Sequence, residues 1–250
     1  VKQMAIFQDL VCYQEEVRDP ARIAEVLNRV IEKARRGSAP AQINVPRDYW
    51  TQVIDIELPQ VIEVERSPGG EAAIAKAAAL LSEASFPVIL NGAGAVLSGA
   101  IETSVSLAER LGAPVCCNYQ HNDAFPGSHP LAAGPLGYNG SKAAMELISR
   151  ADVVLALGTR LNPFSTLPGY GIDYWPKDAR LIQVDINADR IGLTKKVDVA
   201  IQGEARRVAE QLLRQLSVNS GDQGRAQRAD LIAKCKSDWA SELASMDHEE

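Results

Sequence analysis

The sequence contains few cysteines, few histidines and few aromatic residues. Its 250 residues include 4 Cys and 3 His, and aromatic residues make up 5%. The cysteines, at positions 12, 116, 117 and 235, form no CxxC pair, and a chain of this length buries a sizeable core without disulfide bonds. We therefore expect reduced thiols in a cytoplasmic protein rather than a disulfide framework.

The sequence also lacks an excess of positive charge and a long apolar run. Lys and Arg number 26 against 32 Asp and Glu, and the net charge of -6 is the wrong sign for binding nucleic acid through its phosphates. The longest apolar stretch, residues 86–101, is interrupted by Pro87, Asn91 and three glycines, so it is too short to span a bilayer. We expect neither a nucleic-acid partner nor a membrane.

Local patterns divide the chain into four segments. The first contains a helix that begins at Asp19 and Pro20 and ends at Gly37, and a short strand at 41–45 follows it. The second is a linker, the third alternates helices with strands, and the fourth is a polar connector with a helical tail. In order, the segments are residues 1–48, 49–70, 71–216 and 217–250.

The third segment has strands that are apolar throughout. Strands without polar alternation are buried on both faces, as in a parallel sheet covered by helices on each side. We therefore predict an α/β fold with a doubly wound parallel sheet. The expected helices cover 71–84, 101–111, 141–150 and 204–216, and the expected strands cover 87–90, 114–117, 153–157, 181–184 and 197–201.

The apolar residues of the tail fall on one helical face, at Leu231, Ile232, Cys235, Trp239 and Leu243. Such a stripe needs a partner, which we expect to lie outside this chain. The first residues also have the pattern of the middle of an amphipathic element. We therefore expect the sequence to be a piece of a longer polypeptide.

A glycine-rich turn at Gly92, Ala93 and Gly94 follows an expected strand and precedes a helix. Glycines in this context let phosphates approach backbone amides. The full GxGxxG pattern is absent because Leu97 occupies the last position, so a tight structural turn and a nucleotide-facing loop both remain open.

A second turn, at Gly158, Thr159 and Arg160, follows the expected strand at 153–157. Open α/β sheets bind ligands at the carboxyl ends of their strands, and the planar guanidinium suits a phosphate or carboxylate. Arg160 could equally form a surface ion pair. Asp185 ends the next strand, where it could accept a ribose hydroxyl or cap the backbone at Asn187.

No arrangement of residues provides catalytic machinery or a metal site. His121 and His129 lack the i, i+4 spacing of a helical zinc site, which favours a polar loop. Cys116 and Cys117 would point to opposite faces of a strand, as small core residues do. With no catalytic triad, nucleophile elbow or P-loop, the sequence predicts a ligand-binding α/β domain.

Several strings resemble the middle of thiamine-diphosphate enzymes of the acetolactate synthase group. Strings similar to the whole group lie at 124–131 (AFPGSHPL), 134–137 (GPLG) and 157–160 (LGTR). Longer strings resemble the branch of this group that acts on sulfoacetaldehyde, at 13–19 (YQEEVRD), 119–123 (YQHND) and 162–176 (NPFSTLPGYGIDYWP). The resemblance extends from residue 1 to about residue 216.

The resemblance implies an acyltransferase that uses thiamine diphosphate and Mg²⁺ to convert sulfoacetaldehyde and phosphate into acetyl phosphate and sulfite. It assigns 1–48 to the end of a pyrimidine-binding domain, 71–216 to a central Rossmann-like domain, and 217–250 to a connector and the start of a diphosphate-binding domain. The residues that activate and hold the cofactor are expected outside this chain, which alone should be inactive. A cytoplasmic homodimer or homotetramer is expected.

The resemblance also implies a nucleotide crevice in the central domain. Flavin-containing relatives build it from a glycine turn, a Gly-x-Arg turn and an acidic strand end. These match Gly92, Ala93 and Gly94, then Gly158, Thr159 and Arg160, then Asp185. The relatives continue with acidic and Arg residues where this sequence has Leu161 to Phe164, which argues against FAD.

Two other functions remain open. An acetolactate synthase-like carboligase is one, and Phe164, at a position where the flavin relatives have Arg, argues against it. The other is a free-standing nucleotide-binding module without catalysis. The partial αβ unit at 1–48 argues against that module, because a complete domain would not begin inside another domain's unit.

Overall fold

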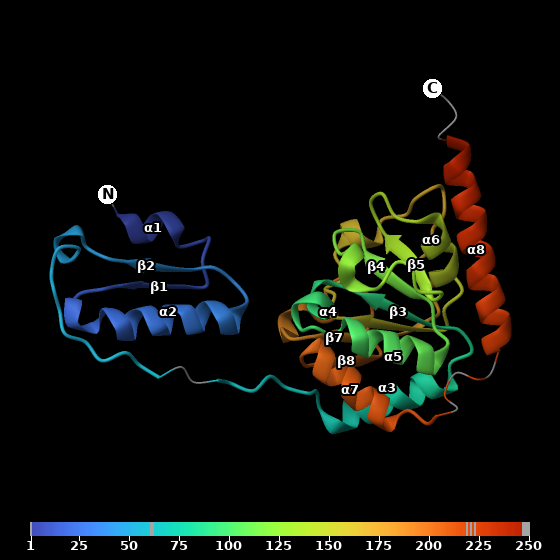
Figure 1. Cartoon of the computed structure of the whole chain (residues 1–250), viewed down its shortest axis with the longest axis horizontal. Helices are drawn as coiled ribbons and strands as arrows, with labels where there is room; N and C mark the ends of the chain where they lie inside the picture. Colours follow the sequence, from blue (N-terminus) through green and yellow to red (C-terminus); the bar gives the residue numbers. More distant parts are fainter. Residues whose placement is uncertain (1, 61–62, 219, 221, 223, 247–250) are drawn as a thin grey trace. The chain divides into compact units, whose positions relative to one another are not determined.

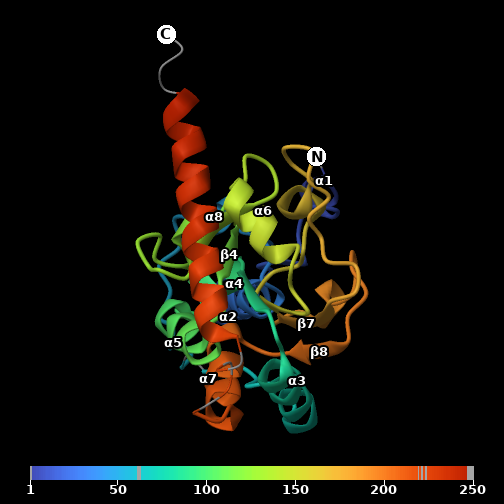
Figure 2. The same ribbon diagram turned by 90° about the vertical axis from the view of Figure 1, so that its right-hand side faces the viewer.

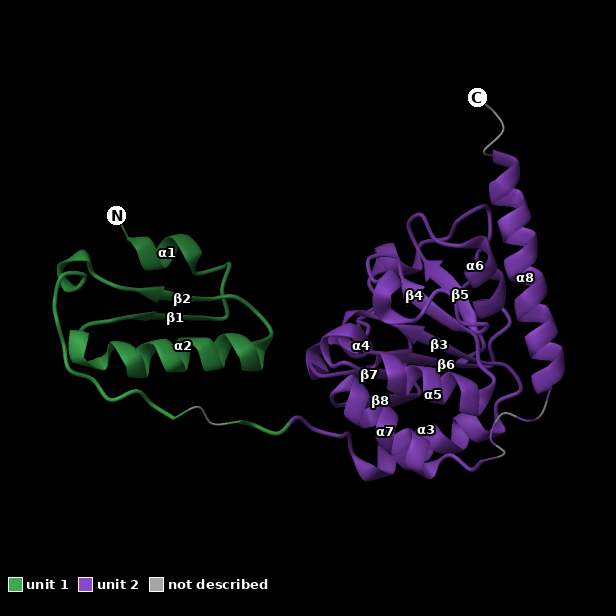
Figure 3. Ribbon diagram, in the orientation of Figure 1, with its two compact units in different colours: residues 1–65 green, residues 66–250 purple. Residues whose placement is uncertain are grey.

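The computed structural model describes residues 2–60, 63–218, 220, 222 and 224–246. Two compact units make up the chain, Val1–Glu65 and Arg66–Glu250 (Figure 3). Among the described residues, no helix combines the length and the apolarity that crossing a membrane requires. The assignment of the four sequence segments to domains of a longer enzyme stays a prediction.

The first unit is a small αβ layer. Its strands β1 and β2 pair in parallel, with Tyr13 opposite Ala41. The predicted helix is confirmed: the Asp19 carboxylate accepts a hydrogen bond from the Ala21 amide at the start of a 3-10 turn, and α2 follows directly. The elements are α1 (Gln3–Phe7), β1 (Tyr13–Glu16), α2 (Ile23–Gly37) and β2 (Ala41–Asn44).

The second unit contains the predicted doubly wound sheet (Figure 1). All six strands are parallel, in the order β5-β4-β3-β6-β7-β8. Successive strands are therefore added toward one edge from β3 to β5, and toward the other edge from β6 to β8. The strands are β3 (Pro87–Asn91), β4 (Val115–Asn118), β5 (Ala132–Leu136), β6 (Val153–Leu157), β7 (Arg180–Asp185) and β8 (Val199–Gln202).

Helices cover both faces of this sheet, which explains the uninterrupted apolar strands. Along β3, Ile89 belongs to one core and its neighbours Val88 and Leu90 to the other. Helices α3, α5 and α7 pack on the first face, and α6 and α8 on the second (Figure 1). The helices are α3 (Glu71–Glu83), α4 (Ala93–Leu97), α5 (Ile101–Leu111), α6 (Lys142–Ile148), α7 (Ala205–Gln215) and α8 (Arg225–Met246).

The connection from β6 to β7 contains no α-helix. Residues 158–179 form an irregular segment with one short 3-10 turn, Pro163–Thr166. Tyr174 from this segment is fully buried in the second core, where burial raises the pKa of its phenol. An irregular chain with a buried aromatic anchor therefore covers part of this face.

The tail packs on the same unit, so the expectation of a partner outside the chain is wrong. Ile232 and Cys235 of α8 are buried in the second core, and Leu231 and Trp239 pack against it. The helix runs along α6 (Figure 1, Figure 2). Only the last residue of the predicted stripe, Leu243, is largely exposed.

Arg228 fastens the start of α8 to the sheet layer. Its side chain is 2% exposed and donates hydrogen bonds to the carbonyl oxygens of Gly112 (3.2 Å), Ser85 (2.8 Å) and Leu111 (3.0 Å). Burial lowers the pKa of this guanidinium. A cation is retained here because it satisfies carbonyl groups from two separate loops.

Replacing Arg228 with Met keeps an apolar stem but removes all of these donors. We expect Arg228→Met to lower the free energy of unfolding by roughly 2–4 kcal/mol, because buried acceptors lose their partners. Lys234→Met, on the same helix at a side chain that is 71% exposed, should change it by less than about 0.5 kcal/mol. Urea unfolding measures the free energy of unfolding of both variants. Equal midpoints would show that the hydrogen bonds of Arg228 do not stabilise the protein.

Candidate functional site

The two predicted turns meet where the strand order reverses. Strands β3 and β6 are neighbours in the sheet, yet the chain leaves them toward opposite edges. The residues Gly92, Ala93 and Gly94 follow β3, and Gly158, Thr159 and Arg160 follow β6. This switch point, at the carboxyl ends of the strands, is where open α/β sheets bind ligands.

Direct contact between the two turns explains their glycines. The Gly94 amide donates to the Gly158 carbonyl oxygen at 2.8 Å, and the Gly92 amide donates to Leu157 at 3.1 Å. A Cβ on Gly94 would lie 2.7 Å from the Gly158 Cα, and Gly158 itself has a φ of +64°. The glycines therefore allow two backbones to touch, as in the structural interpretation of the first turn.

A buried hydrogen bond between two side chains lies next to Gly92. Asn118, at the end of β4, donates from Nδ2 to the Thr159 hydroxyl at 3.0 Å. A Cβ on Gly92 would lie 2.5 Å from the Thr159 Cβ and 2.9 Å from that nitrogen. The Thr159 hydroxyl also accepts from the Leu161 amide at 3.1 Å, so Thr159 is fully engaged within the protein.

Gln183 holds the second turn from the other side. It is 1% exposed, and its Nε2 donates to the carbonyl oxygens of Thr159 (3.1 Å) and Arg190 (3.2 Å). Its Oε1 accepts from the Gly192 amide at 2.9 Å. Neither Gln183 nor Asn118 is predicted from the sequence, although a polar residue in an otherwise apolar strand is a usable signal.

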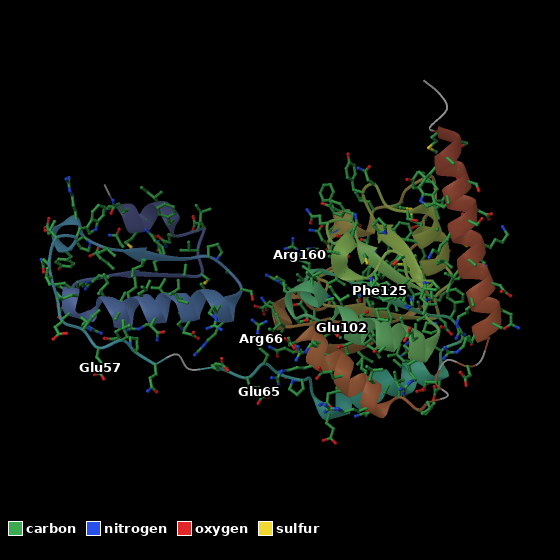
Figure 4. The ribbon with its side chains drawn as sticks, viewed as in Figure 1. Glu57, Glu65, Arg66, Glu102, Phe125 and Arg160 are labelled. Atoms are coloured by element: carbon green, nitrogen blue, oxygen red, sulfur yellow. The ribbon has the colours of Figure 1, made fainter. Side chains whose placement is uncertain are left out.

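Arg160 is exposed at the margin of this unit (Figure 4). Within the described residues it has no hydrogen bond or ion pair, so the surface ion pair considered from the sequence is absent there. The neighbouring turn is fixed by Thr159, Asn118 and Gln183. A rigid backbone therefore presents an available guanidinium, which can bind an anion by two parallel hydrogen bonds.

Asp185 ends β7 at the same edge of the sheet. The side chain is 6% exposed, and its Oδ1 accepts from the Asn187 amide at 2.9 Å. This is the local cap considered from the sequence. The structure thus brings Asp185 to the edge that carries both turns, with one carboxylate oxygen already used.

The two cysteines and two histidines considered from the sequence have structural positions. Cys116 and Cys117 lie in opposite cores, and burial raises the pKa of Cys117 to about 12, so it is a thiol. His121 lies 3.7 Å from an Asp123 oxygen and His129 lies 3.3 Å from a Glu109 oxygen, as two separate pairs.

The replacement Gly94→Ala tests the contact between the turns. We expect it to lower the free energy of unfolding by about 1–3 kcal/mol, because the new methyl group overlaps the backbone of Gly158. Gly127→Ala is the matched control, since nothing lies within 4 Å of its Cβ position and its φ is not positive. A Gly94→Ala protein as stable as Gly127→Ala would show that the turns can separate freely.

Comparison with known proteins identifies the family. Residues 74–212 match the model of the thiamine pyrophosphate enzyme central domain, and the chain belongs to this family. Over 250 residues it is 72% identical to a probable sulfoacetaldehyde acetyltransferase of Rhizobium meliloti and 72% identical to a sulfoacetaldehyde acetyltransferase of Roseovarius nubinhibens. The match covers 100% of this chain but 42% of each relative.

The chain is also similar to more distant proteins. A probable acetolactate synthase large subunit of Methanocaldococcus jannaschii is 33% identical over 221 residues, which cover 85% of this chain and 37% of that protein. Among solved structures, a putative thiamin diphosphate-dependent enzyme of Mycobacterium smegmatis has a TM-score of 0.71 at 22% identity, covering 87% of this chain and 41% of that one. The structural likeness supports the fold.

The described residues contain no cluster of metal-binding side chains. Among them, no group of three or more His, Cys, Asp or Glu side chains could hold a metal ion. Mg²⁺ on a diphosphate is usually held by one or two carboxylates together with phosphate oxygens.

Proposed function

We propose that the chain is the central part of an enzyme that converts sulfoacetaldehyde and inorganic phosphate into acetyl phosphate and sulfite. The observation that carries the proposal is the 72% identity, across all 250 residues, to proteins named sulfoacetaldehyde acetyltransferase. Acetolactate synthase relatives are far less similar, at 30% to 33% identity. The carboligase is therefore the second candidate.

The intact enzyme would use thiamine diphosphate with Mg²⁺, bound by residues outside this chain. When bound, the thiazolium ring supplies an electron sink for carbanion chemistry. This chain would contribute the rigid central domain, as a cytoplasmic homodimer or homotetramer. No residue described above is assigned to the chemical step.

We also propose that Arg160 binds the phosphate of an adenine nucleotide at the switch point. Its exposure at a fixed strand end supports this role. The amides of Gly92 and Gly94 are already bonded to backbone carbonyls, so the glycine turn contributes fewer donors than a dinucleotide-binding turn does. Asp185 is the candidate for a ribose hydroxyl. Because Leu161 to Phe164 depart from the flavin pattern, FAD is not proposed.

Sulfite release by the intact gene product tests the activity. Sulfoacetaldehyde and phosphate should yield sulfite and acetyl phosphate only when thiamine diphosphate and Mg²⁺ are present. Omission of phosphate is the control, because phosphate is the proposed acetyl acceptor. Condensation of pyruvate without any sulfite formation would instead favour the carboligase.

Calorimetric titration of ADP and FAD tests whether Arg160 binds a nucleotide phosphate. We expect ADP to bind the intact protein and Arg160→Ala to weaken it by about 10- to 150-fold, the effect of losing a charge-assisted hydrogen bond. Arg214→Ala, at another exposed arginine, is the control and should change nothing. If ADP gives no heat with the wild-type protein, the switch point is a structural junction only.

A further inference from the structure

A cavity of about 520 Å³ lies at the opposite edge of the sheet from Arg160. Its walls are the two connections that enter β7 and β8, residues 175–181, 194–196 and 198, together with Val154 near the start of β6. The volume falls within the usual range of small-molecule sites. The cavity belongs to no part of the candidate site described above.

The cavity occurs where covering helices are missing. The β6–β7 connection contains only the 3-10 turn Pro163–Thr166, and the β7–β8 connection only Ala188–Arg190. The carboxyl end of an α-helix attracts cations, but neither connection brings such an end to this edge.

Two of the four basic side chains that line the cavity are neutralised. Arg180 forms an ion pair with Asp198 at 2.7 Å, and Asp198 also accepts from the Leu181 amide at 2.9 Å. Lys177 lies 3.1 Å from an Asp173 oxygen. These two ion pairs balance the charges of Arg180 and Lys177.

The other two basic side chains, Lys195 and Lys196, have no carboxylate partner among the described residues. The Lys195 ammonium lies 4.7 Å from the centre of the Trp175 ring, and this cation–π contact holds it over the cavity. Asp178 is the remaining acidic residue of the lining, and it is exposed. Lys195 and Lys196 therefore face one lining acid that is outside the ion pairs, Asp178, which leaves an excess of positive charge in the cavity.

We propose that this cavity binds the phosphate group of a small molecule through Lys195 and Lys196. The charge of a phosphate dianion matches two lysine side chains that line the same cavity, and its oxygens accept the hydrogen bonds that ammonium groups donate. The Trp175 ring orders one of these groups before the ligand arrives, which lowers the entropic cost of binding. The ligand is either inorganic phosphate or a phosphorylated organic compound.

Titration calorimetry with inorganic phosphate and with ADP tests the site on the intact protein. We expect at least one of them to bind, and Lys195→Gln and Lys196→Gln each to weaken it by about tenfold. Binding of phosphate alone identifies the free ion as the source, and stronger binding of ADP identifies a phosphorylated compound. Trp175→Phe, which keeps a ring under Lys195, should retain most of the affinity.

Two further variants separate this site from alternatives. Lys234→Gln, at an exposed lysine of α8, should leave the affinity unchanged. Equal weakening by Lys234→Gln would show attraction to overall charge and overturn the proposal. Binding that Arg160→Ala abolishes and Lys195→Gln leaves intact would place the ligand at the switch point and overturn it, as would the absence of heat from both probes.

Discussion

The backbone contact between the glycine turn after β3 and the Gly158 turn after β6 determines how the central sheet is joined. The two halves of a doubly wound sheet meet only along these two strands. A 2.8 Å hydrogen bond from Gly94 to Gly158 closes the junction at the carboxyl edge. A Cβ at either glycine would overlap the opposite turn, so the close contact at this edge depends on two missing side chains.

Buried amide side chains link this junction to the neighbouring strands. Asn118 ties the end of β4 to Thr159, and Gln183 ties the same turn to the loop after β7. Four neighbouring strands are thereby fixed relative to one another at one edge. Such polar groups are stable in the interior because they are hydrogen-bonded there, Asn118 to Thr159 and Gln183 to three backbone groups. One consequence is that Arg160 extends from a backbone that is held on both sides.

The sequence predicted the fold because its core strands are uninterrupted apolar runs between helical patterns. It missed β1 and β5, since Tyr13–Glu16 is mostly polar and Ala132–Leu136 contains Gly and Pro, which are rare in strands. The positions of both turns were predicted, but not their mutual contact. Spacing along one chain cannot distinguish a glycine that touches backbone from one that faces a phosphate, because both need the same missing Cβ.

The two edges of the sheet differ in how their cations are held. At the carboxyl edge, hydrogen bonds position the backbone under Arg160 and leave its side chain to solvent. At the amino edge, irregular connections replace helices, and an aromatic ring positions Lys195 directly. Both edges use the strands β6 and β7, because Arg160 and Asp185 lie at their carboxyl ends and the cavity lies where they begin. The two sites nevertheless have no residue in common, so a substitution at one leaves the side chains of the other in place.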